Sequence, residues 1–175
     1  MTQVLAPCPG RLLPITEVDD PVFAQEMVGP GVAIDPDPGE TTVVSPIAGK
    51  VVKIHPHAFV VLGDDGVGVL VHLGINTVRL EGKGFEVIAA QGDTVTVGTP
   101  MVRWDPSAIT GEGMSSVVPV VAMDQPKGAV PDDLSKDGTA GFPLIRLKKW
   151  SDSRACRLLA LKGCRCISRM RGPNL

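Results

Sequence analysis

The apolar residues of the chain occur in short runs, which Gly, Pro, Asp and Asn residues separate. Many of these runs are rich in Val and Ile, whose branched side chains suit a pleated, half-buried surface. Short runs of this kind, bounded by turn residues, predict strands joined by tight turns. We expect the strands within residues 40–54, 58–74, 85–104, 115–123 and 139–150.

Helical signals are few along the chain. Residues 20–29 predict a helical turn or two, with Asp20 as the N-cap, Pro21 at the first position and Gly29 at the end. Residues 105–110 predict one further turn. The pattern therefore predicts an all-β sandwich or barrel with one or two short helical turns.

The composition fits a domain of this kind. The 175 residues are 43% apolar but only 3% aromatic, so Val, Ile and Leu must build the core. The 20 glycines and 16 prolines suit a fold with many turns. No signal peptide is visible, and no apolar stretch is long enough to span a membrane. We therefore expect a cytoplasmic protein without direct membrane insertion.

The net charge of −2 conceals two parts of opposite charge. Residues 1–149 contain 11 basic and 18 acidic residues, whereas residues 150–175 contain six basic residues and one acid, Asp152. We expect residues 1–149 to form the domain. We expect residues 150–175 to be a basic tail rich in Cys and Arg, which is either disordered, an out-of-frame extension or a helix at a membrane surface. The acidic body lacks aromatic stacking platforms and a phosphate-binding glycine loop, so nucleic-acid and nucleotide binding are not expected.

All three histidines of the chain, His55, His57 and His72, fall within 18 residues. His57 and His72 flank a hairpin whose turn is predicted at Asp64-Asp65-Gly66. Either two-residue loop places the two rings on one face of the hairpin, opposite each other or on a diagonal. A three-residue loop would send them to opposite faces. Two of the three registers thus predict a pair of imidazoles.

A pair of neutral imidazoles has two main uses. The rings can bind a metal through their lone pairs, and His55-Pro56-His57 with His72 is a candidate zinc set for a β-rich zinc protein or hydrolase. Alternatively, one ring can accept a phosphoryl group while the other donates a hydrogen bond to its oxygens. A zinc hydrolase also needs an acidic ligand or base, and the hairpin has carboxylates only at its far turn, Asp64 and Asp65.

Several stretches of the sequence then point to one family. They are VDDPVFAQEMVGPGVAIDP (18–36), VVSPIAGKVVKI (43–54), HAF (57–59), GVGVLVHLGINTVRLEGKGF (66–85), GDTVTVGTPMV (92–102), VVPVVAM (117–123) and PLIRLKK (143–149). Together they resemble the IIA domain of the glucose family of the bacterial phosphoenolpyruvate-dependent sugar phosphotransferase system. The resemblance covers about residues 4–149, and the tail matches nothing in the family.

The resemblance implies a flattened antiparallel β-sandwich, or barrel-sandwich hybrid, and a phosphotransferase activity. His72 would accept a phosphoryl group from the carrier protein HPr, and His57 would stabilise that group. The phosphate would pass to the IIB domain of a glucose or N-acetylglucosamine permease at the membrane. No cofactor is implied, although zinc at His57 and His72 is conceivable at a partner interface. We expect a monomer.

The resemblance also suggests residues for partner docking and marks three departures. Phe23, Phe59 and Leu70 are candidates for an apolar depression that docks HPr and IIB. The family usually has threonine where this chain has His55, which could supply an orienting hydrogen bond. It commonly has aspartate where this chain has Asn76, and glutamate at Gly68. These departures concern partner docking more than the chemistry.

Overall fold

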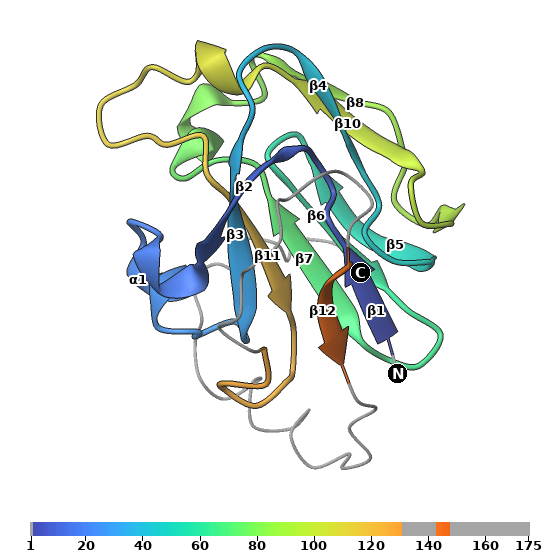
Figure 1. Cartoon of the computed structure of the whole chain (residues 1–175). Coiled ribbons are helices and arrows are strands. Elements are labelled where there is room, and N and C mark those ends of the chain that lie inside the picture. The colour runs from blue at the N-terminus through green and yellow to red at the C-terminus, as the bar shows by residue number, and fades with distance from the viewer. Residues whose placement is uncertain (1, 131–142, 148–175) are drawn as a thin grey trace, which may run out of the picture.

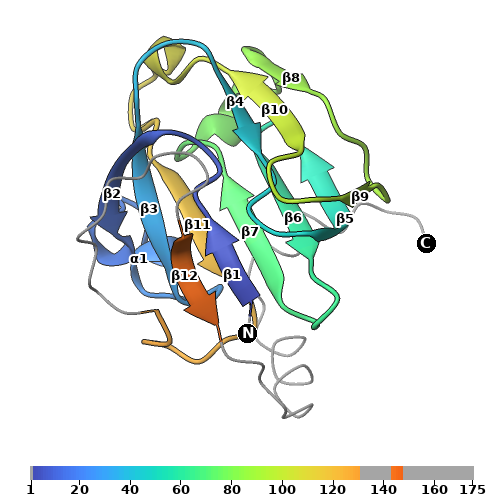
Figure 2. The same ribbon diagram turned by 45° about the vertical axis from the view of Figure 1, so that its right-hand side comes forward.

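The structure, a computed structural model, describes residues 2–130 and 143–147, and it consists mainly of antiparallel sheets. The largest sheet has seven strands in the order β2-β3-β11-β7-β6-β5-β9. They are β2 (Gly10–Pro14), β3 (Gly31–Pro36), β11 (Val118–Ala122), β7 (Gly68–His72), β6 (Ala58–Leu62), β5 (Gly49–His55) and β9 (Thr94–Val95). Figures 1 and 2 show how these strands lie beside two smaller sheets.

The two smaller sheets complete the sandwich. One has the order β4-β10-β8, from β4 (Thr41–Val44), β10 (Pro100–Trp104) and β8 (Phe85–Val87). The other pairs β1 (Thr2–Leu5) with β12 (Pro143–Leu147), which lie side by side in both views (Figures 1 and 2). The predicted antiparallel β-sandwich is therefore confirmed. The pairing of β1 with β12 joins the two ends of the described chain.

The helical elements are single turns. They are η1 (Ile15–Glu17), α1 (Pro21–Ala24), η2 (Thr77–Leu80) and η3 (Pro106–Ala108). Asp20 caps α1 as predicted, because its side chain accepts a hydrogen bond from the backbone N–H of Val22 at 2.8 Å. The helix ends at Ala24, however, and does not extend to the predicted Gly29.

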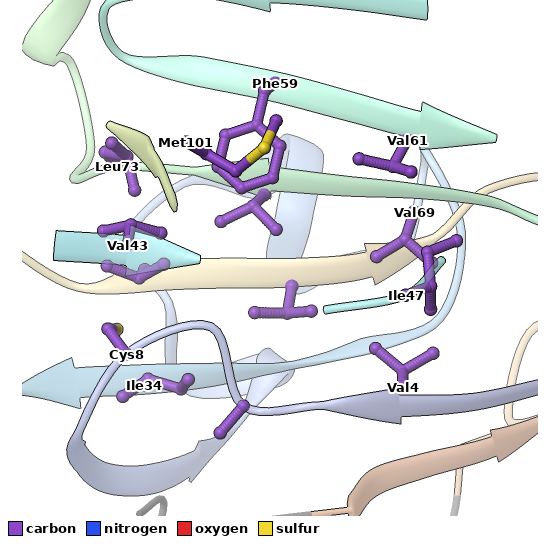
Figure 3. Packing of buried hydrophobic residues seen from close by; sticks show 14 of the residues in the cluster. Val4, Cys8, Ile34, Val43, Ile47, Phe59, Val61, Val69, Leu73 and Met101 are labelled. Carbon is purple, nitrogen blue, oxygen red and sulfur yellow. The ribbon is translucent and has the colours of Figure 1, made fainter. Parts of the chain in front are cut away.

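The main core lies between the sheets and is almost entirely aliphatic. Figure 3 shows Phe59 of β6 beside Met101 of β10, and Val61 of β6 and Val43 of β4 belong to the same cluster. Val69 and Val71 of β7 belong to the same cluster, and all these side chains are buried. One face of the β6–β7 hairpin therefore forms the centre of the sandwich.

The opposite face of the same hairpin packs under α1. Ala58, Val60 and Leu70 belong to a second buried cluster, in which Phe23 of α1 is the aromatic member. Because strand residues alternate between faces, these side chains point away from the main core. The hairpin is thus buried on both sides, and His72 lies at the end of its second strand, on the α1 side.

The loop of the hairpin differs from both favoured registers. Ala58 pairs with His72 and Leu62 with Gly68. The N–H of Gly63 donates to the carbonyl of Val67 at 2.9 Å, which closes a three-residue loop with Gly66 at φ +83°. A three-residue loop with a glycine in the left-handed region is a common hairpin connection. The register prediction was therefore wrong.

Candidate functional site

His72 lies at the end of β7 with its ring nearly buried. Its side chain is 8% exposed, and Nδ1 lies 2.6 Å from the carbonyl oxygen of Gly74. A carbonyl can only accept a hydrogen bond, so Nδ1 must hold the proton. The lone pair of the neutral ring is then on Nε2, which makes Nε2 the nucleophilic nitrogen.

The loop after β7 fixes the position of that carbonyl. Gly74 has φ +80°, and a Cβ there would lie 2.5 Å from Cγ2 of Thr77 and 2.6 Å from the carbonyl oxygen of Ser115. The buried hydroxyl of Thr77 donates to the carbonyl of Leu73 at 2.6 Å. The N–H of Ile75 donates to the carbonyl of Ser115 at 2.7 Å. Sequence reasoning missed these residues, although Gly74 and Asn76, two turn residues directly after a strand, are a usable signal.

Strand alternation does not explain why the ring of His57 lies next to the ring of His72. His55 pairs with Ala58, so Pro56 and His57 form the two-residue turn between β5 and β6. A turn residue does not obey the alternation of a strand, and its side chain can project over either face. The predicted pair of rings therefore exists even though the register that was to produce it does not.

The rings of His57 and Phe23 both contact the ring of His72. The centroids of His57 and His72 are 5.3 Å apart in an edge-on arrangement. Phe23 contacts His72 at 5.4 Å between centroids, and the rings are tilted by 58°. The N–H of Leu73 donates to the carbonyl of His57 at 2.7 Å and thereby ties the turn to the end of β7. His57, His72 and Phe23 come from three different elements, and the fold brings them together.

The environment keeps both histidines neutral. Burial first, and then the neighbouring His72 and His55 rings, lower the pKa of His57 to about 4. Burial also lowers the pKa of His72, while the hydrogen bond to Gly74 and the carboxylate of Asp20 oppose this effect. At neutral pH the pair consequently offers one lone pair and one N–H on each ring.

His55 stacks on His57 and makes no hydrogen bond to it. The two ring centroids lie 5.8 Å apart and the planes differ by only 12°. Burial, and then the charge of Lys53, lower the pKa of His55. The sequence suggested that His55 could donate an orienting hydrogen bond; the contact is a ring stack.

The predicted docking residues lie below the surface. Phe59 is 0% exposed and faces the main core (Figure 3), so its proposed contact with partners was wrong. The reason is its register with Val71, which assigns it to the core face. Leu70 is 2% and Phe23 3% exposed, which makes them the floor beneath the histidines. Met27 after α1 and Val78 in η2, which sequence reasoning missed, are 50% and 46% exposed.

The structure shows the surroundings of Asn76 and Gly68, two positions at which this chain differs from the usual residues of the family it resembles. Asn76 has φ +59°, and its side-chain amide donates to the carbonyl of Gly113 at 2.7 Å, a bond that an aspartate could not donate. At Gly68 a Cβ would meet only Met123, at 3.6 Å, so the site has room for a side chain. Gly68 begins β7, at the opposite end of the strand from His72.

The zinc alternative finds no support in the geometry. Among residues 2–130 and 143–147, no group of three or more His, Cys, Asp or Glu side chains could hold a metal ion. The hydrogen bond to Gly74 occupies Nδ1 of His72, and Cys8 lies in the main core. In the same residues, no helix is long and apolar enough to cross a membrane.

Comparison with known proteins gives one consistent result. A sequence model of the family described as phosphoenolpyruvate-dependent sugar phosphotransferase system, EIIA 1, matches residues 2–127. The glucose-specific EIIA component of the phosphotransferase system from Staphylococcus aureus (strain COL) is 42% identical over 128 residues, which are 72% of this chain and 76% of that protein. The corresponding Staphylococcus epidermidis protein is 42% identical over 121 residues, 68% of this chain and 72% of its own.

A solved structure agrees with these relatives. Glucose permease IIA from Mycoplasma capricolum superposes with a TM-score of 0.72 at 32% identity, covering 82% of this chain and 93% of that one. Residues 2–127, which the family model covers, include all three histidines. The chain therefore belongs to the EIIA 1 family of the phosphoenolpyruvate-dependent sugar phosphotransferase system.

Proposed function

We propose that this protein is a phosphocarrier of a sugar phosphotransferase system, in which Nε2 of His72 accepts a phosphoryl group from phospho-HPr and passes it to a IIB domain. The observation that supports this most directly is the hydrogen bond from Nδ1 of His72 to Gly74, beside the ring of His57. It leaves a single nucleophilic nitrogen on a neutral ring. Family membership supplies the system in which the phosphoryl group moves.

The transfer needs only one bond to form and one to break. The lone pair of Nε2 attacks phosphorus while the bond from phosphorus to the histidine of HPr breaks, and the electron pair of that bond returns to the HPr ring. The His72 ring then has phosphorus on Nε2 and its proton on Nδ1, which Gly74 continues to accept. Such a ring is positively charged and leaves as a neutral imidazole when the cysteine of IIB attacks the phosphorus.

His57 would stabilise the phosphoryl group during its transfer to and from His72. Its ring lies 5.3 Å from that of His72, close enough for an N–H to reach an oxygen of a phosphoryl group on Nε2. A fixed donor aimed at developing negative charge stabilises the transition state, and more strongly in a site that excludes water. The incoming phosphoryl charge also raises the pKa of His57, so this ring gains a proton more readily once His72 is phosphorylated.

Docking of both partners would use the surface around the pair. Phe23 and Leu70 are buried beneath the histidines, and Met27, just after α1, and Val78, in η2, are exposed apolar side chains that the two partners would contact in turn. We assign the phosphocarrier role to residues 1–149 and place the protein in the cytoplasm, where HPr and the IIB domain of a permease would meet it. Glucose or N-acetylglucosamine would be the sugar, a choice that the permease makes.

The test is phosphate uptake by the purified protein. The chain is mixed with phosphoenolpyruvate, enzyme I and HPr and weighed by intact mass, beside His72→Gln and His57→Gln. We expect one acid-labile phosphate on the wild type and none on His72→Gln. His57→Gln should accept phosphate slowly and pass it poorly to IIB. No phosphate on a folded wild type with competent partners contradicts the proposal, and an equal phosphate on His72→Gln contradicts the assignment of the acceptor.

A further inference from the structure

We infer, resting on the proposed phosphocarrier function, that His55 is a positioning residue: its ring stacks on that of His57 and holds His57 in the orientation that serves a phosphoryl group on His72. The two rings are 5.8 Å apart at their centroids and within 12° of parallel. His57 in turn meets His72 edge-on at 5.3 Å. His55 would thus act on the reaction through a second side chain.

His57 needs such support because of where it lies. It occupies a two-residue turn, and its side chain is only partly buried. Its backbone is fixed by the hydrogen bond from Leu73. In the part of the chain that the structure describes, however, its ring nitrogens make no hydrogen bond, and its recorded ring contacts are His55 and His72. Side-chain rotation of His57 is therefore restrained by ring packing, and one of the two rings is the phosphate acceptor itself.

The backbone around His55 is suited to give that support. His55 is the last residue of β5 and pairs with Ala58, which closes the turn formed by Pro56 and His57. The ring of Pro56 fixes its own φ, and Gly82 lies behind it, where a Cβ would come within 3.2 Å of Cγ of Pro56. A strand end and a buttressed turn thus present the two imidazoles side by side.

The charges around the stack favour two neutral rings. Lys53 on the same strand lowers the pKa of His55, after burial, and the pKa of His57 is about 4. The carboxylate of Asp20 acts on His72 from the α1 side. Two neutral imidazoles can stack without repulsion, as aromatic pairs at this separation do.

The experiment compares His55→Ala with His55→Phe in the full chain. Phenylalanine keeps a flat ring for the stack but cannot titrate or donate, whereas alanine removes the ring. The first measurement is an NMR titration of the unphosphorylated protein, with the nuclear Overhauser contact between His57 and His72. Alanine should raise the pKa of His57 toward its usual value, because it exposes the His57 ring to water and removes the neighbouring His55 ring. It should also weaken the nuclear Overhauser contact between His57 and His72. Phenylalanine should raise this pKa less and keep the contact.

The second measurement is the rate of phosphate transfer from phospho-HPr and onward to IIB. His55→Ala should slow transfer about tenfold, a part of the roughly hundredfold that an ångström of misplacement can cost, and His55→Phe should restore most of the rate. Slow transfer with an unchanged His57 titration, or a changed titration with unchanged transfer, overturns the positioning role. If the wild type takes up no phosphate, the phosphocarrier proposal fails, while the titration and the ring contact still decide whether His55 positions His57.

Discussion

The two faces of the β6–β7 hairpin are both buried, yet they serve different purposes. On the core face Phe59, Val61 and Val69 are 0% exposed and belong to the main apolar cluster. On the α1 face the row Ala58, Val60 and Leu70 ends at the polar ring of His72. Packing on both sides holds β7 rigidly, and this also fixes the position of His72 at the end of the strand. The hairpin therefore separates stability, on one face, from candidate chemistry, on the other.

Truncation of one phenylalanine on each face is the strongest test of this separation. Phe59→Ala should reduce the free energy of unfolding by about 3–5 kcal/mol, because it leaves a cavity in the main core. The rate of phosphate uptake per folded molecule should stay nearly unchanged. Phe23→Ala also removes a buried ring, but that ring touches His72, so uptake should slow as well. Urea unfolding and single-turnover phosphorylation measure the two effects; equal slowing in both variants would contradict the separation.

Gly74→Ala should damage both stability and chemistry. The left-handed backbone and the two close contacts make a Cβ unfavourable there, at a cost of about 1–3 kcal/mol from backbone strain alone. The carbonyl that accepts the Nδ1 proton should shift as well, and phosphate uptake should fall. Gly66→Ala is the matched control, since Gly66 has φ +83° but open space around it, at the far end of the hairpin. Thermal unfolding and phosphate uptake that respond alike in the two variants would rule out a special role for the Gly74 carbonyl.

The pH dependence of stability should reveal the neutral state of the pair. The pKa of His57 is about 4 in the folded protein against a usual 6.5, so the unfolded chain binds more protons between these values. The free energy of unfolding should therefore fall as the pH drops through this window and should not depend on His57 above it. Urea midpoints of wild type and His57→Gln, measured from neutral pH to about pH 5, separate the contribution of His57 from that of carboxylate protonation, which both proteins share. Parallel curves for the two proteins would show that His57 is not buried as the structure has it.

Asn76→Asp should have the smallest effect. An aspartate tolerates the left-handed backbone but cannot donate to the carbonyl of Gly113, so the loss should be about 1 kcal/mol. Phosphate uptake should change little, because the bond lies on the loop and not on the ring of His72. Chemical denaturation beside the uptake assay checks both points. A large loss of uptake with intact stability would instead place the charge of residue 76 in partner docking.

Much of the fold was predictable because its signals are local. Apolar runs between turn residues located β4 to β12, and Asp20-Pro21 located the start of α1. The strands within residues 2–36 were not anticipated. For β1 the reason is that its partner strand, β12, lies at the other end of the described chain, so the sequence around β1 does not reveal the pairing. The tail predicted at residues 150–175 lies outside the described residues.

The candidate site was predictable in part, for a similar reason. The clustering of the histidines identified the hairpin, but their meeting depends on a turn at Pro56-His57 that alternation rules cannot represent. The resemblance suggested Phe59 as a docking residue, but the resemblance alone does not show that the register of Phe59 with Val71 turns its ring into the main core. The carbonyl of Gly74, which selects the tautomer of His72, is a backbone group, and residue types alone do not show where it points.

The bond from Nδ1 of His72 to Gly74 has one more consequence, for the transfer itself. If the ring keeps this proton before, during and after the phosphoryl group is attached, no proton moves in the bond-making step in either direction. The rate of that step should then be nearly the same in heavy water as in ordinary water. A ring whose attacking nitrogen is bare from the outset can exchange a phosphoryl group with either partner freely, and the direction of flow is left to their relative phosphorylation.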